Sequence, residues 1–527
     1  MFKDVIKFEK GCGLMKLKNV MLSALLTAAG CVLTGALWPA GMVSCCEAQK
    51  LKEERHDSFY WLGEINKASL VINSRQGLLT QDEAVFFARG LERVLAKGRM
   101  GGERPGLVIT FEPLLIAEAG EEVTKVHAGR SSQDMLMTCR LMKSREQLLE
   151  LADALNGLSA RLLAMAEEQR EAVVPSYTNG VAAQPESYGH YLLAYADAFA
   201  RDAERLQQYY ARLNRSPMGT TVLNGSGWPL DREAMAEYLG FDGIAYNAYD
   251  AVQVYSLEAA VEAGSVINPL AIHVGSFIED VMQQYAQPRP WLLLEEGGAN
   301  TYVSSAMPQK RNPGILNRVR TNASTLLGDV VGAAFRAHNI PPGMADARNS
   351  AQDRLLAGGI KLVEDFTHIL QALKLNRERA LEELNLDWTA TQEIADILMR
   401  DYGVPFRVGH HFASEIVSYA RPRGLTPLTL TYAEAREVYR RAVEGHPGAP
   451  GELPLSEAQW HSALEPAGIV QGRATLGGPQ PSEISKMLAA GRKRLEENQR
   501  WLRRRQAQLQ AADRRLQSDF QQLKAGQ

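Results

Sequence analysis

Cysteine is scarce in this sequence and is unevenly placed. Of the 5 cysteines in 527 residues, Cys12, Cys31, Cys45 and Cys46 lie near the N-terminus, and only Cys139 lies in the rest of the chain. If the N-terminal part is removed during processing, the remainder has a single thiol and can form no internal disulfide. The fold is therefore not built on cross-links, and an oxidising compartment would not harm it.

The sequence also lacks an excess of either charge. Its 58 lysines and arginines against 61 aspartates and glutamates give a formal net charge of −3, which offers no electrostatic argument for binding nucleic acid. No Walker loop, dinucleotide-binding glycine fingerprint or zinc-type spacing occurs in a suitable context. His410 and His411 form no recognisable set of metal ligands, and we expect them to be structural or surface residues. The sequence predicts no cofactor, metal or nucleic-acid partner.

The N-terminal segment contains a long uncharged run. Residues 20–46 carry no charged side chain and follow two lysines, a pattern typical of a secretory signal. Met15 is an alternative start, because MKLKNVML is a more usual opening. We interpret residues 1–48 as a leader that directs export, so that the mature protein is periplasmic or secreted. An uncleaved membrane anchor and a lipid anchor at Cys45 are the alternatives, and without a functional leader the protein would stay in the cytoplasm.

Beyond the leader the hydrophobic pattern is helical. Apolar residues recur every three or four positions from Leu141 to Glu168, and a second long pattern from Ala251 to Tyr285 is interrupted only by Pro269. Helices of this length, with few stretches of alternating polarity, predict an all-α protein built around a bundle of long helices. The tail from Arg494 onward is charged, and we expect a solvated helix or a subunit contact. The expected helical domains cover residues 49–134, 135–386 and 387–527.

The loop from Gly297 to Pro313 is mostly polar and begins with two glycines. A helical pattern resumes directly after it, so we expect Asn312 to cap that helix and Pro313 to open it. The N-terminus of a helix offers unpaired backbone N–H groups and favours anions. With a serine pair and Lys310 in the same loop, a carboxylate site is predicted. The simpler interpretation is an ordinary surface loop before a capped helix.

The last ten residues of this loop, SSAMPQKRNP, closely resemble the signature SSxMPxKxNP of the fumarase/aspartase superfamily, and MPQK resembles its argininosuccinate lyase branch. The resemblance implies that Ser304 is the general base that removes a proton beside a carboxylate. Lys310 and Asn312 would hold that carboxylate as it gains charge, and Ser305 would help to bind the substrate. Because a serine hydroxyl is a poor base, its alkoxide would need stabilisation by N–H donors and the lysine.

Two other segments resemble substrate-binding motifs of the same branch. Residues 127–134, HAGRSSQD, stand where the family has HTGRSRND, and the resemblance assigns Ser131 and Gln133 to the dicarboxylate part of the substrate. Residues 177–185 resemble the family's YTHLQRAQP at both ends, which assigns Thr178 to the same role. The middle of this second segment is rewritten.

The chain departs from the family at the expected acid. The family's histidine, an acid/base candidate, is Asn179 here, and the glutamate that orients it is Asn317. An amide cannot deliver a proton at neutral pH, so another group protonates the departing nitrogen or none needs to. His190 is one alternative acid, although a histidine in a helix is more often structural. The coupled replacement of both partners indicates an altered site rather than random decay.

A further set of family residues is also replaced. Aligned without gaps, Met344, Asn349 and Gln352 stand where argininosuccinate lyases carry a tyrosine, a glutamine and a lysine for the substrate. The side chains that would bind the amino-acid end of argininosuccinate are therefore largely absent. These three positions, with Asn179 and Asn317, are kept as candidate substrate-binding residues.

The resemblance covers most of the chain, from Trp61 to Leu488. It implies a homotetramer whose central bundles form the core and whose sites combine loops from different chains. The leading hypothesis is a lyase that releases fumarate from an N-substituted aspartate, a small amino-dicarboxylate, without a cofactor. A true argininosuccinate lyase is the alternative, weakened by the replaced residues and the leader. A catalytically silent structural or binding relative is the alternative of another class, and the retained Ser304, Lys310 and Asn312 weigh against it.

Overall fold

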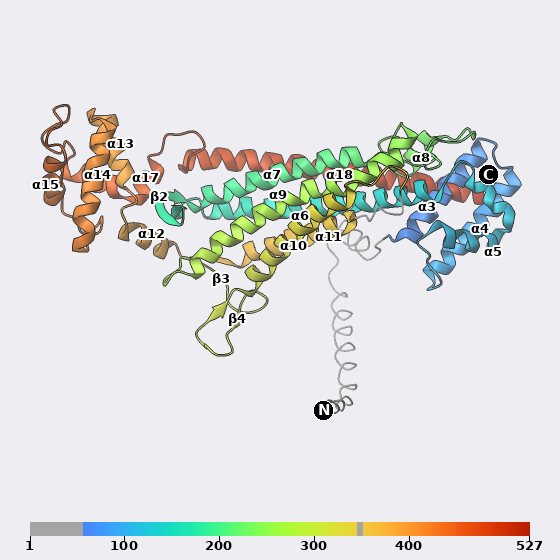
Figure 1. The fold of residues 1–527 in the computed structure, drawn as a ribbon, viewed down its shortest axis with the longest axis horizontal. Coiled ribbons are helices and arrows are strands. Elements are labelled where there is room, and N and C mark those ends of the chain that lie inside the picture. The colour runs from blue at the N-terminus through green and yellow to red at the C-terminus, as the bar shows by residue number, and fades with distance from the viewer. Residues whose placement is uncertain (1–55, 345–350) are drawn as a thin grey trace, which may run out of the picture. The chain divides into compact units, whose positions relative to one another are not determined.

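The computed structural model describes residues 56–344 and 351–527, so the expected leader lies outside the described residues. The described part is predominantly helical (Figure 1). The helices are α3 (Ser58–Arg75), α4 (Gln81–Arg99), α5 (Val108–Ala119), η1 (Glu121–His127), α6 (Ser132–Glu168), α7 (Tyr188–Leu213), α8 (Arg232–Tyr238), η2 (Asp250–Val254), α9 (Tyr255–Tyr285), α10 (Gly314–Ala337), α11 (Gln352–Ala372), α12 (Arg377–Leu386), α13 (Thr391–Tyr402), α14 (Phe406–Ala420), η4 (Arg421–Arg423), α15 (Tyr432–Ala442), α16 (Glu457–Leu464), α17 (Pro466–Gln471) and α18 (Pro481–Ala525). The strands are β1 (Val173–Thr178), β2 (Val181–Ser187), β3 (Leu292–Leu294), β4 (Tyr302–Val303), β5 (Arg311–Asn312) and β6 (Leu373–Leu375).

Long helices that pack lengthwise form a central bundle. α9 packs against α10, α11 and α7, and α6 packs against α7 and α11 (Figure 1). The apolar stripe expected on α6 faces this core, where Leu151, Leu155 and Leu158 are at most 1% exposed. Pro269 lies inside α9 without ending it. The prediction of an all-α fold with long bundled helices is confirmed.

The strands form only two-stranded ribbons in the described residues. β1 and β2 pair antiparallel, with Thr178 opposite Val181, so Asn179 and Gly180 make a two-residue loop. Their φ angles are 53° and 76°, as a type I′ turn requires, and Asn-Gly is the pair that adopts it most readily. The helical interpretation of the sequence misses this hairpin, although Asn-Gly between two apolar runs is its usual signal.

The buried apolar side chains form two clusters. The larger runs from Phe59 through the bundle to Leu523, so the helices before the bundle share its core. The smaller lies between Trp388 and Ile469, in α13 to α17. The domain boundaries expected at residues 134 and 386 stay predictions.

The last helix, α18, packs along α6, α4, α7 and α3. Its side chains Leu516 and Phe520 are at most 1% exposed. The amide of Gln517 donates to Glu64 at 2.8 Å and accepts from Lys67 at 2.9 Å. The charged tail therefore has one face in the core of its own chain, in addition to the solvated face expected from its sequence.

Candidate active site

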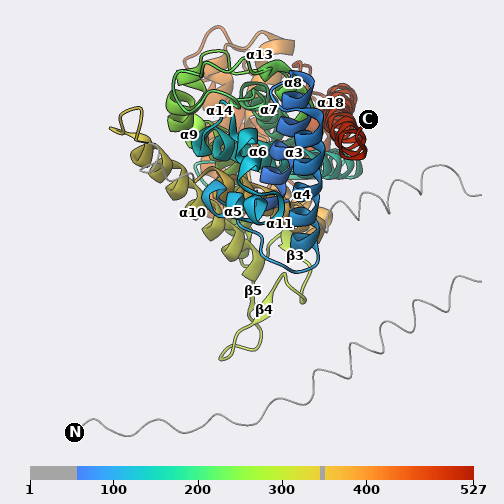
Figure 2. The same ribbon diagram turned by 90° about the vertical axis from the view of Figure 1, so that its right-hand side faces the viewer.

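The signature loop folds as a small hairpin before α10. β4 and β5 pair with Tyr302 opposite Asn312, and the Ser304 N–H donates to the Lys310 carbonyl oxygen at 3.2 Å. The hairpin projects away from the helices in both views (Figures 1 and 2). Ser305 and Lys310 are exposed, and Ser304 is partly buried. The predicted catalytic groups therefore lie at the surface of the chain, where a substrate or a second chain can reach them.

The prediction that Asn312 caps α10 is wrong. Asn312 lies in β5, where its side-chain amide donates to the Tyr302 carbonyl oxygen at 3.3 Å. α10 begins at Gly314 with Pro313 in the capping position and with no side-chain cap. Pairing across the hairpin engages the Asn312 amide and keeps it from the first turn of the helix.

Ser304 is held as a hydrogen-bond acceptor. Its Oγ accepts from the Ala306 N–H at 3.4 Å and from the Met307 N–H at 3.2 Å. Backbone donors aimed at an oxygen favour its anionic form, so this turn lowers the cost of forming an alkoxide. Lys310 has no ion-pair partner within residues 56–344 and 351–527, whereas the neighbouring Arg311 pairs with Glu296 at 2.9 Å. The Lys310 ammonium is thus available to a carboxylate.

The second part of the predicted site is the turn that opens α6, residues 131–134, which we term the α6 turn. Ser131 caps the helix, its Oγ accepting from the Gln133 N–H at 3.3 Å. Asp134, with no exposed surface, accepts from the Ser131 N–H at 2.8 Å and from the N–H groups of Thr220 and Thr221 at 3.0 Å each. Burial raises the pKa of Asp134, and these bonds oppose the rise. A buried carboxylate thus fixes the α6 turn to a distant loop.

The loop that contains Thr220 and Thr221 has a strained backbone. Thr221 and Val222 have φ angles of 49° and 68°, a left-handed conformation that β-branched residues rarely adopt. Gln253 holds it: its Nε2 donates to the Val222 carbonyl oxygen at 2.9 Å, and its Oε1 accepts from the Gly343 N–H at 2.8 Å. Gln253 is 1% exposed and lies in η2, a single π-helical turn. Strained backbone and π-helical turns are frequent at functional sites, and sequence reasoning missed this residue.

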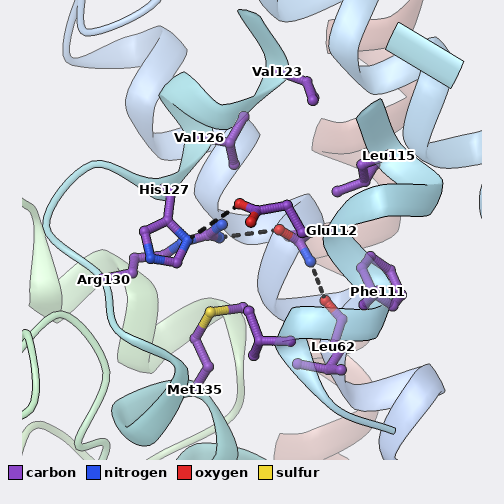
Figure 3. A pocket seen from close by; sticks show the side chains of 11 residues that line it. Leu62, Phe111, Glu112, Leu115, Val123, Val126, His127, Arg130 and Met135 are labelled. Carbon is purple, nitrogen blue, oxygen red and sulfur yellow. Dashed lines mark hydrogen bonds and ion pairs between the residues drawn. The ribbon is translucent and has the colours of Figure 1, made fainter. Parts of the chain in front are cut away.

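Arg130, immediately before the α6 turn, is buried. Its Nη1 donates to the Asn66 Oδ1 at 3.1 Å, and Figure 3 shows it beside His127 and Glu112 in a small cavity whose remaining lining residues, apart from Asn66, are apolar. Burial lowers the pKa of Arg130 to about 10. Burial, and then the positive charge of Arg130, lower the pKa of His127. These contacts fix Arg130, the residue that immediately precedes the α6 turn.

The remaining predicted residues are dispersed. Thr178 and Asn179 are exposed at the tip of the β1–β2 hairpin, and Asn317 is partly buried in the first turn of α10. Met344 is 53% exposed. Gln352 is 2% exposed at the start of α11 and donates to the Tyr209 hydroxyl at 2.8 Å. Asn349 lies outside the described residues.

His190 is engaged through both ring nitrogens. Nδ1 lies 2.7 Å from the Glu186 carboxylate and Nε2 lies 2.9 Å from the Gly477 carbonyl oxygen. The hydrogen bond to Glu186 raises the pKa of His190. These partners favour the structural interpretation of this histidine over its use as a replacement acid.

A single chain does not bring the predicted residues together. Ser131 precedes α6 and Thr178 follows it, and α6 has 37 residues. At a rise of 1.5 Å per residue the helix separates them by about 55 Å, far more than the length of a small substrate.

Comparison with known proteins places this geometry in a family. A lyase family model matches residues 87–328, and an argininosuccinate lyase C-terminal model matches residues 387–471. The argininosuccinate lyase of Methanospirillum hungatei is 31% identical over 445 residues, covering 82% of this chain and 87% of that protein. That of Methanothrix thermoacetophila is 29% identical over 465 residues, covering 86% and 92%.

Solved structures agree with these matches. EDDS lyase in complex with formate is 26% identical with a TM-score of 0.81, covering 89% of this chain and 92% of that one. An EDDS lyase variant with bound fumarate gives the same values. The class II fumarase of Schistosoma mansoni, 16% identical with a TM-score of 0.60, shares the fold.

The all-α fold and the signature hairpin thus define a lyase. The chain belongs to the fumarase/aspartase superfamily, in its argininosuccinate lyase-like branch. It is a carbon–nitrogen lyase of the type that releases fumarate from an N-substituted aspartate.

Proposed function

We propose that Ser304 is the base with which this lyase eliminates an amine from an N-substituted aspartate. The observation that carries the proposal is the pair of backbone N–H bonds from Ala306 and Met307 to the Ser304 Oγ. Each unit by which the pKa of a hydroxyl is lowered requires about 1.4 kcal/mol of preferential stabilisation of the alkoxide. The two donors and the nearby Lys310 are the groups on this chain that can supply it.

The elimination needs three electron movements. Ser304 takes a proton from the carbon beside the carboxylate, and the C–H electron pair moves into that carboxylate, whose added charge Lys310 and Asn312 hold. The pair then returns to form the C=C bond of fumarate as the C–N bond breaks. The amine leaves with the C–N electron pair and needs one proton. Asn179 cannot give it, so the proton comes from water or from an amine that is already protonated.

We also propose that the active enzyme is a homotetramer whose sites combine several chains. The separation of Ser131 from Thr178 along α6 supports this proposal, because one chain holds the two residues at opposite ends of a 37-residue helix. The Ser304 hairpin of one chain would meet the α6 turn and the β1–β2 hairpin of others. This arrangement accounts for the exposure of the signature hairpin in one chain.

Two bundle helices expose apolar side chains that a tetramer would cover. Val261 and Ile272 on α9 are 40% and 51% exposed, and Val331 and Phe335 on α10 are 55% and 75% exposed. The segment 250–285 is long and apolar enough to cross a membrane, and its most apolar window is 50% buried in this chain. A helix of this kind at the centre of an assembly passes the same test, and exposed apolar surface on neighbouring helices favours contact between copies.

A panel of substrates tests the proposed reaction. N-substituted aspartates with different amines, argininosuccinate among them, are incubated with the enzyme while fumarate is followed by ultraviolet absorbance. Fumarate formed in equal amount to the amine supports the proposal. Argininosuccinate as the fastest substrate would favour a true argininosuccinate lyase, and no turnover of any compound would favour a silent relative.

Mixed assemblies test the shared site. The variants Ser304→Ala and Thr178→Ala are expressed separately and together. If the two residues of one site come from different chains, some sites in the mixture have both residues intact, and activity exceeds that of either variant alone. A mixture no more active than its parts would contradict the proposed assembly.

Export remains a proposal that rests on residues 1–48. Sequencing of the mature N-terminus tests it, since a cleaved leader predicts a start close to residue 49. A full-length protein in the cytoplasm would contradict it.

A further inference from the structure

Asn300 lies at the base of the signature hairpin, two residues before β4. Its carbonyl oxygen accepts from the N–H of Ile315, in the first turn of α10, at 3.2 Å. This bond joins the two ends of the hairpin below the pairing of β4 with β5. Ser304 lies four residues further along, about 13 Å from the base at the rise of an extended strand. At that distance a tilt of about 5° at the base displaces Ser304 by about 1 Å.

The side chain of Asn300 connects this base to two other segments. Its Nδ2 donates to the Glu295 carbonyl oxygen at 3.2 Å, and its Oδ1 lies 3.0 Å from the His368 Nε2. Because a carbonyl oxygen can only accept, the amide nitrogen of Asn300 faces Glu295 and its amide oxygen faces His368. The Nε2 of His368 therefore carries a proton and donates it to this bond.

Both partners of the Asn300 side chain are anchored to α11. The Glu295 N–H donates to the carbonyl oxygen of Ala372, the last residue of this helix, at 2.7 Å. His368 lies one turn earlier, where the neighbouring Phe366 and Ile369 have no exposed surface, although its own ring is exposed. Since α11 packs against α6, α9 and α10, these bonds tie the base of the hairpin to the core of the bundle.

The direction of the hairpin depends on this base. β4 and β5 have two residues each and form a two-stranded ribbon that projects from the helices (Figure 2). The chain enters the loop through Gly297 and Gly298, whose φ angles of 89° and 55° lie in the region that favours glycine, and neither residue has a side chain that could pack. The start of α10 and the contacts of Asn300 are therefore the features that orient the ribbon.

We propose that Asn300 is a positioning residue for the elimination and that His368 acts through it. The two residues orient the signature hairpin so that Ser304 reaches the substrate carbon in a site that other chains complete. The inference rests on the proposed role of Ser304 as the base. Because a misplacement of about 1 Å can lower a rate by about 10²-fold, a small tilt of the hairpin should reduce turnover.

The experiment compares variants at both ends of the bond in the full-length enzyme, with fumarate absorbance as the signal. Asn300→Ala keeps the backbone bond to Ile315 and removes both side-chain bonds, so kcat is expected to fall by about 10- to 100-fold. His368→Leu removes one bond and should lower kcat by about three- to ten-fold. His368→Gln should recover most of the wild-type turnover, because the amide nitrogen of glutamine can donate in place of the imidazole Nε2.

Further measurements separate positioning from folding. The double variant Asn300→Ala/His368→Leu should be no slower than Asn300→Ala, because both substitutions remove the same bond. Hydrogen exchange should increase in peptides from residues 301–312, while the melting temperature changes little because these residues lie outside the two buried clusters. His411→Leu is the matched control, at an exposed histidine of α14, and should leave turnover unchanged.

The outcomes distinguish this inference from the proposed function. Unchanged kcat in Asn300→Ala, beside a Ser304→Ala variant that has lost turnover, overturns the inference and leaves the base assignment standing. Wild-type turnover in both variants overturns the proposed role of Ser304 itself. His368→Gln as slow as His368→Leu overturns the part assigned to the hydrogen bond. If Asn300→Ala does not fold, the leucine and glutamine variants of the exposed His368 decide the question by the same comparison.

Discussion

The two polar turns of the predicted site are built in opposite ways. The signature hairpin is exposed, and among the described residues its Ser304 Oγ accepts hydrogen bonds only from N–H groups of its own turn. The α6 turn is fixed by the fully buried Asp134, which joins it to residues more than eighty positions away. The hairpin therefore presents reactive groups to partners outside the chain, whereas the α6 turn is preorganised within it. Substitutions in the signature hairpin should therefore change turnover, and substitutions in the buried network that holds the α6 turn should change the free energy of unfolding.

The largest expected effect is that of Ser304→Ala on turnover. We expect kcat to fall by about 10³-fold, the usual contribution of a general base, while the melting temperature stays the same because the side chain lies in an exposed hairpin. Fumarate absorbance and thermal unfolding measure the two effects. Ser324→Ala, at an exposed position of α10 where the hydroxyl donates to the Arg320 carbonyl oxygen, is the control. Unchanged turnover in Ser304→Ala would refute its role as the base.

Asp134→Asn should act on the other turn, mainly through stability. An asparagine amide turns at least one N–H donor toward the N–H groups that the carboxylate accepts from, so one buried group loses its partner. We expect a loss of about 1–3 kcal/mol in the free energy of unfolding, measured by urea denaturation. Asp231→Asn is the matched control, since Asp231 caps α8 at an exposed site and asparagine caps equally well. Equal effects of both variants would contradict the special role of the buried network.

Val222→Gly should have a smaller effect of opposite sign. Removing the side chain relieves a left-handed residue, a gain of about 1–2 kcal/mol, and the greater freedom of glycine in the unfolded chain offsets part of it. We expect a net gain of roughly 0.5–1 kcal/mol in thermal unfolding. Val181→Gly, at an exposed position of β2 in the β1–β2 hairpin, should destabilise the protein instead. A loss of stability in Val222→Gly would show that the turn is not strained.

The smallest effects concern two histidines with opposite shifts of pKa. His127 has a lowered pKa, so the unfolded chain binds its proton first and stability is lost as pH falls below about 6.5. His190 has a raised pKa, so its contribution is present below about 6.5 and is lost as pH rises through the raised value. His127→Gln should therefore reduce the acid sensitivity of the melting temperature, and His190→Gln should destabilise more at pH 6 than at pH 8. Equal effects at both pH values would contradict this assignment.

Local patterns could be predicted from the sequence, and contacts between distant segments could not. The stripe of leucines on α6 and the signature from Ser304 onward depend on neighbours in sequence, and both gave correct expectations of helix and family. The role of Asn312 as a helix cap was predicted wrongly because its amide bonds the Tyr302 carbonyl oxygen on the opposite strand of the signature hairpin. Gln253 and Val222 could not be found from the pattern, since their importance comes from a bond between distant segments and from a backbone angle.

The Asn179–Gly180 turn shows how one residue can satisfy two requirements. The absence of the family's histidine at this position indicates an altered acid, and the left-handed backbone gives asparagine an independent advantage there. A test of the acid by restoring histidine at position 179 would therefore also change the turn. The double change with Asn317 back to glutamate is the informative comparison, because a purely conformational effect would not depend on residue 317.

The contact between the last helix and the first ones has a consequence for biosynthesis. Because the larger core joins Phe59 to Leu523, its final layer is supplied only when almost all of the polypeptide has left the ribosome. Until then the emerging chain lacks α18, which packs against the first helices, α3 and α4. Such late closure would keep the nascent chain from folding completely before its end is made, which the proposed export through a translocation pore would require.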